Sequence, residues 1–374
     1  MRALGLDGTV PGAAPGDGSG PERVRAVADH LLALQGQDWH GSRWALGVRA
    51  PGTTDDDVLA AFDSGSLVRS WPMRGTIHVL AAEDIGWMQA AMGHRVLSGA
   101  AKRRQQLGLD DDTLARMTEV AIERLTGGRS LSRDELAAAW SEAGIGDPEK
   151  GVGPWRYHVI WWLCQNGVAV AGPVRDGTAG AGSGVPEPRL VLAEEWIAAP
   201  RRLDGDEALA ELAHRFARGR GPVQERDLAW WTGLTLREVR RGIAAAEADG
   251  RIAPIEVEGA RYWADPELLA GPSAVPGAAL LLPGFDEHLL GYTDRSAMLA
   301  PEHFELVVPG RNGMFRATVV ERGRAVGVWL RTPRARRVLV EALPFPGETL
   351  DLERLRGPAE AWGAFRGVEI ELGA

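Results

Sequence analysis

The chain has 374 residues, of which 45% are hydrophobic and 25% are charged, and its formal net charge at pH 7 is -9. This balance is typical of a folded globular protein and excludes fibrous or largely disordered chains; at ~100–200 residues per domain, the length predicts two or three domains. The single cysteine, Cys164, excludes an intramolecular disulfide, and no uncharged apolar run approaches the ~20 residues of a membrane-spanning helix, so we expect a cytoplasmic protein.

The first predicted folded module covers residues 21–108 and follows a Gly-rich stretch, residues 1–20, that we expect to be a disordered leader. Within the module, apolar residues at helical spacing and then two alternating runs predict three helices followed by two strands. These elements are expected over residues 22–34, 42–48, 55–62, 67–71 and 76–80.

The same order of elements is predicted twice more, in residues 109–200 and 201–270. Capping boxes open one helix in each of these modules, from Ser132 to Glu135 and from Thr235 to Glu238. The expected helices cover residues 113–125, 132–143, 154–166, 206–217, 223–231 and 235–249, and the expected strands cover 168–171, 189–192, 251–257 and 261–264. Three helices followed by a strand hairpin form a winged helix, so the sequence predicts three tandem winged-helix modules.

The pattern changes in residues 271–374, which predict a β-rich C-terminal domain and thus an α+β fold class. Strands are expected over residues 278–282, 303–308, 313–320, 324–330 and 368–372, and helices over 339–343 and 350–355. We expect the strands to form a small antiparallel, barrel-like unit.

The charges are segregated along the chain. Eight arginines and one acid, Glu321, lie between Arg311 and Arg337, which gives a local charge of +7. The net charge excludes a uniformly basic coat protein, but basic stripes on an acidic protein can hold a phosphate backbone on one face. Together with the winged helices they favour double-stranded DNA as the partner; a solvated arginine-rich surface is the alternative.

Familiar catalytic motifs are absent from the sequence, including phosphate-binding loops, catalytic-serine elbows and paired zinc histidines. The eight histidines are dispersed, so we expect neither a metal nor a cofactor. Cys164 lies in an apolar helical run and is interpreted as a small buried hydrophobe. The paired tryptophans lie in predicted helices and are interpreted as core residues.

Two carboxamides, Gln35 and Gln37, lie on either side of Gly36, at the expected end of a helix. In an extended segment, residues two apart share a face, so this pair could hold a water molecule through its oxygen acceptors and NH₂ donors. The alternative is that both side chains cap the helix end or face solvent.

With three further segments, this motif resembles the AlkZ-like winged-helix DNA glycosylases. The four segments are Leu-Gln-Gly-Gln-Asp at 34–38, Arg-Ser-Trp-Pro-Met-Arg-Gly-Thr-Ile-His at 69–78, Leu-Pro-Gly-Phe-Asp-Glu-His-Leu-Leu-Gly-Tyr-Thr-Asp-Arg at 282–295 and Val-Gly-Val-Trp at 326–329. The resemblance implies tandem winged helices around duplex DNA, with Gln35 and Gln37 as the catalytic pair. The family's middle residue is usually apolar with a side chain, so Gly36 implies either more room beside the lesion or a looser motif.

The resemblance further implies a monofunctional glycosylase that hydrolyses the N-glycosidic bond of N7-alkylated purines, including bulky natural-product guanine adducts or crosslinks, and leaves an abasic site. We expect it to act as a monomer. A non-catalytic winged-helix DNA-binding regulator is the alternative; a metal-dependent nuclease using Asp286 and Glu287 is disfavoured because no coherent ligand set accompanies them.

Four other residues are candidate DNA contacts. Arg74 and His78 flank a predicted turn, Arg175 lies in the enlarged wing at residues 172–188, and Arg295 ends the third family segment. The alternatives are that Arg74 and His78 fasten their module to its neighbours and that the wing is a disordered loop. The polar run from Asp286 to His288 is interpreted mainly as structural pairing between the β-rich part and the helices.

Overall fold

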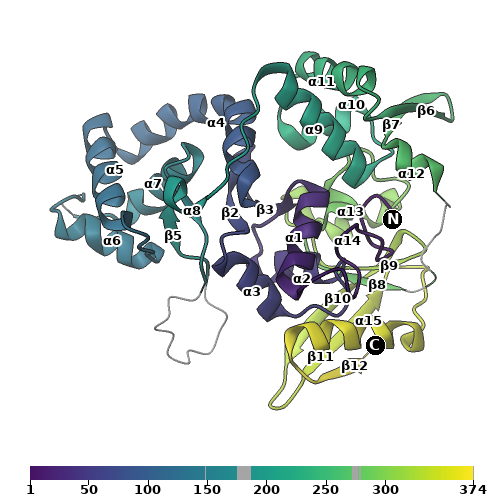
Figure 1. Cartoon of the computed structure of the whole chain (residues 1–374). Coiled ribbons are helices and arrows are strands. Elements are labelled where there is room, and N and C mark those ends of the chain that lie inside the picture. Colours follow the sequence, from purple (N-terminus) through teal and green to yellow (C-terminus); the bar gives the residue numbers. More distant parts are fainter. Residues whose placement is uncertain (148, 175–186, 272–276, 278, 374) are drawn as a thin grey trace. The chain divides into compact units, whose positions relative to one another are not determined.

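Figure 1 shows the computed structural model of the chain, which describes residues 1–147, 149–174, 187–271, 277 and 279–373. The chain packs as two compact units, one formed by residues 1–58 and 209–374 and the other by residues 59–208. Both helices and strands are present, which confirms the α+β class. None of the helices in these described ranges is long and apolar enough to cross a membrane.

In the second unit, strands from two predicted modules lie in one sheet. The strands run side by side in the order β3 (Thr76–Ala81), β2 (Leu67–Met73), β4 (Ala169–Ala171) and β5 (Leu190–Leu192). All three pairings are antiparallel, and β2 meets β4 where Arg69 pairs with Ala171. The predicted boundary at residue 108 therefore does not separate two packing units, and the unit boundary near residue 58 falls inside the first predicted module.

The helices of the second unit cover these strands. They are η1 (Ala82–Asp84), α4 (Ile85–Leu107), α5 (Asp111–Leu125), α6 (Arg133–Glu142), α7 (Gly153–Gln165) and α8 (Ala193–Trp196). The predicted capping box at the start of α6 is confirmed, since Ser132 Oγ accepts from Glu135 N at 3.1 Å and Ser132 N donates to the Glu135 carboxylate at 2.7 Å. The sequence pattern predicts no element over α4, because the C-terminal half of this helix is largely polar and its apolar period is weak.

The core of the second unit is apolar and rich in tryptophan. Trp140 and Cys164 are fully buried within it. Burial raises the pKa of the Cys164 thiol to about 12, so the thiol stays protonated and packs as a small hydrophobe, as predicted. The interpretation of the paired tryptophans as core residues is confirmed for Trp161 and Trp231, which are 9% and 1% exposed, while Trp162 and Trp230 are partly exposed.

The helices of the first unit come from both ends of the sequence. Those up to residue 270 are α1 (Gly20–Leu31), α2 (Trp39–Gly47), α9 (Gly205–Arg220), α10 (Glu225–Thr232), α11 (Leu236–Ala248) and α12 (Pro266–Ala270); α3 (Asp55–Asp63) and the first residues of α9 cross the unit boundary. Strands β6 (Ala253–Val257) and β7 (Ala260–Ala264) follow α11 as an antiparallel hairpin. The predicted elements of residues 206–264 and the capping box at Thr235 are thus confirmed.

A second sheet in this unit has the order β12 (Ile370–Gly373), β11 (Val338–Pro344), β10 (Arg324–Pro333), β9 (Thr318–Glu321) and β8 (Leu280–Leu282). The sheet is open rather than a barrel, because β12 and β8 form its two edges among the described strands. It is also not wholly antiparallel, since β12 runs parallel to β11. Helix α15 (Leu352–Arg366) packs on the sheet (Figure 1), where the rings of Trp329 and Trp362 meet edge to face at 5.7 Å.

Two predicted elements of this region are wrong. The helix expected over residues 339–343 is instead part of β11, where Val340 and Ala342 alternate into the core with period two. The strand expected over residues 303–308 is replaced by η2 (Pro301–His303) and α14 (Phe304–Val307), followed by η3 (Pro309–Arg311). Pro301 sits in the first turn of η2, a position that its fixed φ favours.

The N-terminal segment is packed, and the expectation of a disordered leader is wrong. Leu4, Leu6 and Val10 are at most 4% exposed. The Arg49 side chain donates to the Leu4 carbonyl at 2.6 Å, and a His30 ring nitrogen lies 2.6 Å from the Ala3 carbonyl. A Gly-rich segment can thus be ordered when its few apolar side chains are buried and its carbonyls find donors.

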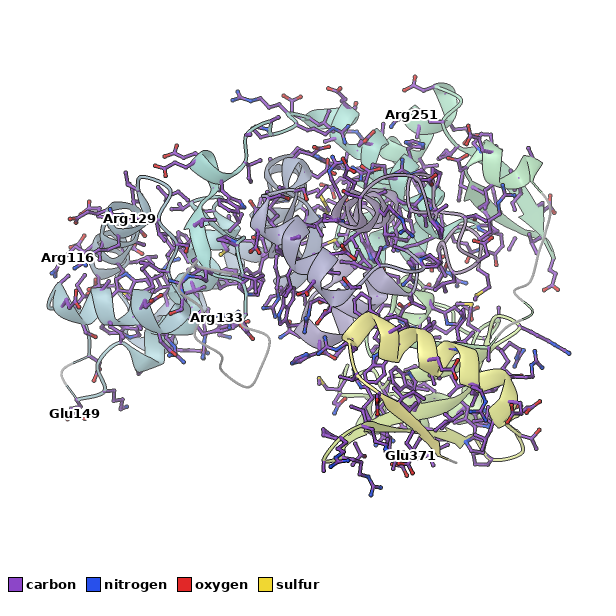
Figure 2. The ribbon with its side chains drawn as sticks, turned by 60° about the horizontal axis from the view of Figure 1, so that its bottom comes forward. Arg116, Arg129, Arg133, Glu149, Arg251 and Glu371 are labelled. Carbon is purple, nitrogen blue, oxygen red and sulfur yellow. The ribbon has the colours of Figure 1, made fainter. Side chains whose placement is uncertain are left out.

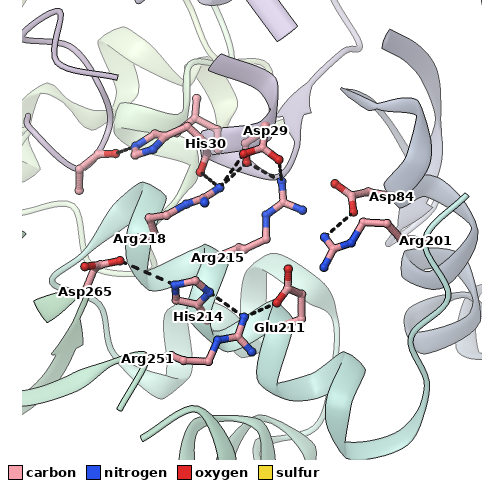
Figure 3. A network of polar contacts seen from close by, with 12 residues as sticks. Asp29, His30, Asp84, Arg201, Glu211, His214, Arg215, Arg218, Arg251 and Asp265 are labelled. Atoms are coloured by element: carbon pink, nitrogen blue, oxygen red, sulfur yellow. Dashed lines mark hydrogen bonds and ion pairs between the residues drawn. The ribbon is translucent and has the colours of Figure 1, made fainter. Parts of the chain in front are cut away.

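Helix α1 is tied to α9 by a polar network (Figure 3). Arg215 and Arg218, three residues apart on one face of α9, both reach the Asp29 carboxylate, at 2.9 and 3.2 Å. Closer to the start of α9, Glu211 and His214 both contact Arg251. This network holds the end of α1, from which the chain enters the glutamine motif.

Candidate active site

The glutamine motif lies on a short extended segment between two helices. Helix α1 ends at Leu31, three residues earlier than predicted, because Leu32 has a φ of +64°. The chain then forms β1 (Leu34–Gln35), and the Asp38 side chain caps α2 by accepting from His40 N at 3.0 Å. Gln35 is therefore extended, while Gln37 lies in a bend beyond the strand, so a common face for the two side chains stays a prediction.

The two glutamines have different surroundings. Gln35 is half-buried, and its Oε1 is a buried acceptor to which no group within the described residues donates. Gln37 is exposed. A buried carboxamide oxygen without a donor is rare in proteins and suits an incoming water or a developing positive charge.

A buried ion pair holds the backbone of this segment. Arg220 is 0% exposed and donates to the Leu31 and Ala33 carbonyls, both at 2.9 Å. Its Nε and Nη2 also donate to Glu287 Oε2, at 3.0 and 2.6 Å. The other oxygen of Glu287 accepts from Gln35 N at 3.3 Å. The position of Gln35 is thus set by two side chains that are 67 residues apart in sequence.

The aromatic rings of the first unit support this pair. The Trp231 indole donates to Glu287 Oε2 at 3.1 Å, and its ring centroid lies 4.4 Å from the Arg220 guanidinium carbon. Cation–π contact and charge-assisted hydrogen bonding together compensate for burying both charges. The sequence pattern distinguishes Glu287 but not Arg220, because arginine is abundant along the whole chain.

A second buried pair lies next to the first. Arg49 holds both oxygens of Asp286 at 2.8 Å, and Asp286 caps α13 (Glu287–Leu290). Burial alone would raise the pKa of Asp286, but the charge and hydrogen bonds of Arg49 keep that pKa below its usual value. Burial lowers the pKa of the neighbouring His288 to about 4, so this imidazole is neutral at pH 7. These contacts agree with the structural interpretation of the run from Asp286 to His288.

Cations surround the segment just after Gln37. Arg43 and Arg366 both pair with Asp55, at 2.5 and 2.6 Å. Burial and the charges of Arg43 and Arg366 lower the pKa of His40. Arg331 belongs to the same positive region, and its guanidinium lies 5.2 Å from the Trp329 ring centroid. Desolvation lowers the pKa of Arg331, while the charge of Asp38 acts to raise it. Three arginines therefore lie around the segment that follows Gln37, and Asp55 and Asp38 offset part of their charge.

The basic stripe predicted between residues 311 and 337 lies partly on an exposed hairpin. Strands β10 and β11 pair as far as Pro333 and Val338, and the backbone of Arg334 bonds that of Arg337 at 2.8 Å across the turn. At the turn of the hairpin, Arg334, Arg336 and Arg337 are exposed. They form a compact set of cations on the first unit, the unit that carries Gln35.

Arg295 lies in the same unit, at a cavity of about 510 Å³ that Arg226 and Arg311 also line. Its Nε donates to the Leu289 carbonyl at 2.6 Å, and its guanidinium lies 5.3 Å from the Trp230 ring centroid. The Arg295 side chain therefore has a partly structural role. Three arginines line the neighbouring cavity.

The remaining candidate DNA contacts belong to the second unit. Arg74 occupies the turn between β2 and β3 with a φ of +51°. His78 on β3 is only 1% exposed, and its Nδ1 lies 3.0 Å from the Thr76 carbonyl. This burial favours a fastening role for His78 over direct phosphate binding. Arg175 lies outside the described residues. The described residues also hold no cluster of three or more His, Cys, Asp or Glu side chains that could bind a metal ion.

Comparisons with known proteins show a family match and a similar fold. The model of the family described as DNA glycosylase AlkZ-like matches residues 28–366. A relative from Streptomyces sahachiroi, the interstrand DNA cross-link repair glycosylase, is 25% identical over an alignment of 312 residues, and the match covers 81% of each chain. The solved structure of Streptomyces sahachiroi DNA glycosylase AlkZ is similar with a TM-score of 0.75 and 22% identity, over 99% of this chain and 97% of that chain. This last likeness establishes a shared fold.

Proposed function

Since this chain belongs to the AlkZ-like DNA glycosylase family, whose members are hydrolases of N-glycosyl bonds in DNA, we propose that its substrates are N7-alkylated purines. In this proposal the product is an abasic site. The observation that carries it is Gln35, whose amide oxygen is buried without a donor among the described residues while the Glu287–Arg220 pair fixes its backbone. Family membership also favours an enzyme over the non-catalytic regulator.

Hydrolysis of an N7-alkylated purine nucleotide does not require a strong general acid or base. A purine alkylated at N7 carries a positive charge, so its glycosidic bond is weak and the base is a good leaving group. The remaining tasks are to orient a water against the sugar C1′ and to stabilise an oxocarbenium-like transition state. A neutral carboxamide oxygen can serve both tasks, and the backbone contacts of Gln35 supply the necessary rigidity.

The positions of the lysine side chains in this chain support hydrolysis without a covalent enzyme–DNA intermediate. The only two lysines, Lys102 and Lys150, lie in the second unit, and neither is in the glutamine motif. A Schiff base requires an amine at the sugar carbon. We therefore propose a monofunctional enzyme, which borohydride will not trap on DNA.

Bulky lesions are the proposed substrates within this class. Gln37 is exposed, while Gly36 is buried and adds no side-chain bulk beside it, so the motif is accessible at Gln37. The similar Streptomyces sahachiroi protein is described as an interstrand DNA cross-link repair glycosylase. Both points support guanine N7 adducts or crosslinks of natural-product size, which a tight pocket for a flipped base would exclude.

The DNA partner is proposed to bind through the cationic surfaces described above. Arg295, the hairpin arginines and the turn at Arg74 are the candidate contacts, and the chain is proposed to contain three winged-helix modules that act on duplex DNA as a cytoplasmic monomer. The order of three helices and a hairpin in residues 205–264 supports the module assignment.

The test measures base release from a duplex carrying one N7-methylguanine, followed by alkali cleavage, and unhooking of a duplex with an N7–N7 guanine crosslink. Wild type should release base, and Gln35→Ala and Gln37→Ala should slow release by about 10²–10³-fold if each positions water or charge. Gln105→Ala, an exposed glutamine on α4, is the matched control. Product from neither duplex, or full activity in both motif variants, would overturn the proposal.

A further inference from the structure

The second unit contains a cavity that the glutamine chemistry does not use. Its volume is about 360 Å³, at the lower end of the range for small-molecule sites. Helices α4 and α7 and the turn between β2 and β3 line it. Gly75, Gly99 and Ala100 contribute almost no side-chain bulk; the larger lining side chains are Val96, Arg103 and Leu107 of α4 and Pro154, Tyr157, His158 and Trp161 of α7.

Three aromatic rings of α7 line this cavity. Trp161 is 9% exposed, and its ring lies 5.2 Å from that of His158 with the planes 31° apart. Tyr157 is 57% exposed and is braced by an edge contact with Trp71 at 6.5 Å. The exposed ring of Tyr157 at a concave site offers a stacking surface for a planar ring, and the largely buried Trp161 forms part of the cavity wall beside it.

The third aromatic residue also carries an unmet hydrogen-bonding group. His158 is only 7% exposed, yet within the described part of the chain no group bonds its Nε2. Burial lowers the pKa of this imidazole, and Arg104 and Arg103 lower it further. A neutral imidazole offers one donor and one acceptor, which suits the edge of a heterocyclic ring.

Positive charge lies at the same cavity. Arg103 lines it, is exposed, and makes a long hydrogen bond of 3.4 Å to Gln106. Arg104 stacks on Trp162 at 4.9 Å and pairs with Asp111 at 3.1 Å, so it is held in place and contributes charge. Stacking rings beside an arginine match a nucleotide, whose base is planar and whose phosphate is anionic.

We propose that this cavity binds an unpaired, undamaged base of the DNA strand, stacked on Tyr157 and Trp161, with His158 at the base edge and Arg103 at its phosphate. The proposal goes beyond the proposed function, because it assigns a nucleotide site outside the glutamine motif and concerns binding rather than hydrolysis. A displaced base would be captured there while its duplex is open.

The test uses a duplex with one bulged 2-aminopurine and the same duplex fully paired. Wild type should bind the bulged duplex more tightly and quench its fluorescence. Tyr157→Ala and Arg103→Ala should each weaken bulge binding about tenfold, the size expected for losing one stacked base. His158→Phe keeps a ring and removes the nitrogen, so it should weaken binding less than Tyr157→Ala. Arg116→Ala, an exposed arginine of the same unit (Figure 2), is the control.

Photocrosslinking locates the base directly. A bulged 5-iodouracil should crosslink to Tyr157 or Trp161, as identified by mass spectrometry. Crosslinks confined to other residues, or equal binding of bulged and paired duplexes, would overturn the proposal. Because Tyr157 is largely exposed, its alanine variant should keep the wild-type melting temperature, which separates lost binding from lost folding.

Failure of this proposal is distinguishable from failure of the glycosylase proposal. Gln35→Ala should bind and quench the bulged probe as wild type does. Quenching by a wild-type protein that releases no alkylated base would contradict only the glycosylase proposal. Base release without any preference for the bulge would contradict only the proposed nucleotide site.

Discussion

The guanidinium of Arg220 and the carboxylate of Glu287 form a buried ion pair at 2.6 Å, and between them they bind three backbone groups at the entrance to the glutamine motif. The pair thus couples the end of α9 and the start of α13 to the position of Gln35. In the proposed mechanism both are positioning residues, which act on Gln35 without touching DNA.

Removal of either Arg220 or Glu287 should therefore lower the free energy of unfolding substantially. Glu287→Ala leaves the Arg220 charge buried and uncompensated, so we expect about 3–5 kcal/mol less stability in chemical unfolding. Glu287→Gln retains an acceptor and should lose less. Glu149→Ala, an exposed position (Figure 2), should change stability by less than ~0.5 kcal/mol. A Glu287→Ala protein as stable as wild type would contradict the assigned role.

Acid should destabilise the first unit through His288. Its pKa is about 4 in the folded protein and 6.5 for an unperturbed histidine, so between these values the unfolded chain binds more protons and stability falls as pH decreases. The lowered pKa of Asp286 acts in the same direction at lower pH. We expect the melting temperature to drop from pH 7 to pH 5, and to drop less in His288→Gln. An equal drop in both proteins would rule out His288 as a source.

The β10–β11 hairpin should contribute to DNA affinity through charge. Replacing Arg334 and Arg336 with alanine should make log affinity less steep against log salt, by about 0.9 for each phosphate that is no longer neutralised. Binding should weaken similarly for different sequences, because phosphate contacts carry no base information. Arg116→Ala is the control for a change in total charge. An unchanged slope of log affinity against log salt in the double variant would show that DNA does not bind at the β10–β11 hairpin.

Arg295 should show two separable effects. Arg295→Ala removes both the bond to the Leu289 carbonyl and a cation from the neighbouring cavity, so the melting temperature and the salt slope should both decrease. Arg295→Lys keeps the charge but loses the planar stacking on Trp230, so it should recover the slope more than the stability. If both variants have the wild-type slope, Arg295 is purely structural.

Local patterns predict much of this molecule. The helices and hairpin of residues 205–264 follow from apolar period, capping boxes and turn residues, all of which act within a few positions of one another. The order of the family segments likewise indicates Gln35 and Gln37 without any knowledge of their contacts. The end of a helix near Gly36 is also predicted, but the helix is expected to reach residue 34, and the extended β1 begins there.

Other features depend on residues that are remote in sequence. The pairing of Arg220 with Glu287, the burial of Leu4 and the meeting of β2 with β4 all require long-range packing that no local window contains. Short apolar runs such as residues 339–343 suit either a helix or a strand, and their neighbours in the sheet select the strand. The choice of Gln35 and Gln37 as candidate catalytic residues thus rests on the family resemblance of four sequence segments, while the backbone position of Gln35 is held by side chains that the folded chain brings to it.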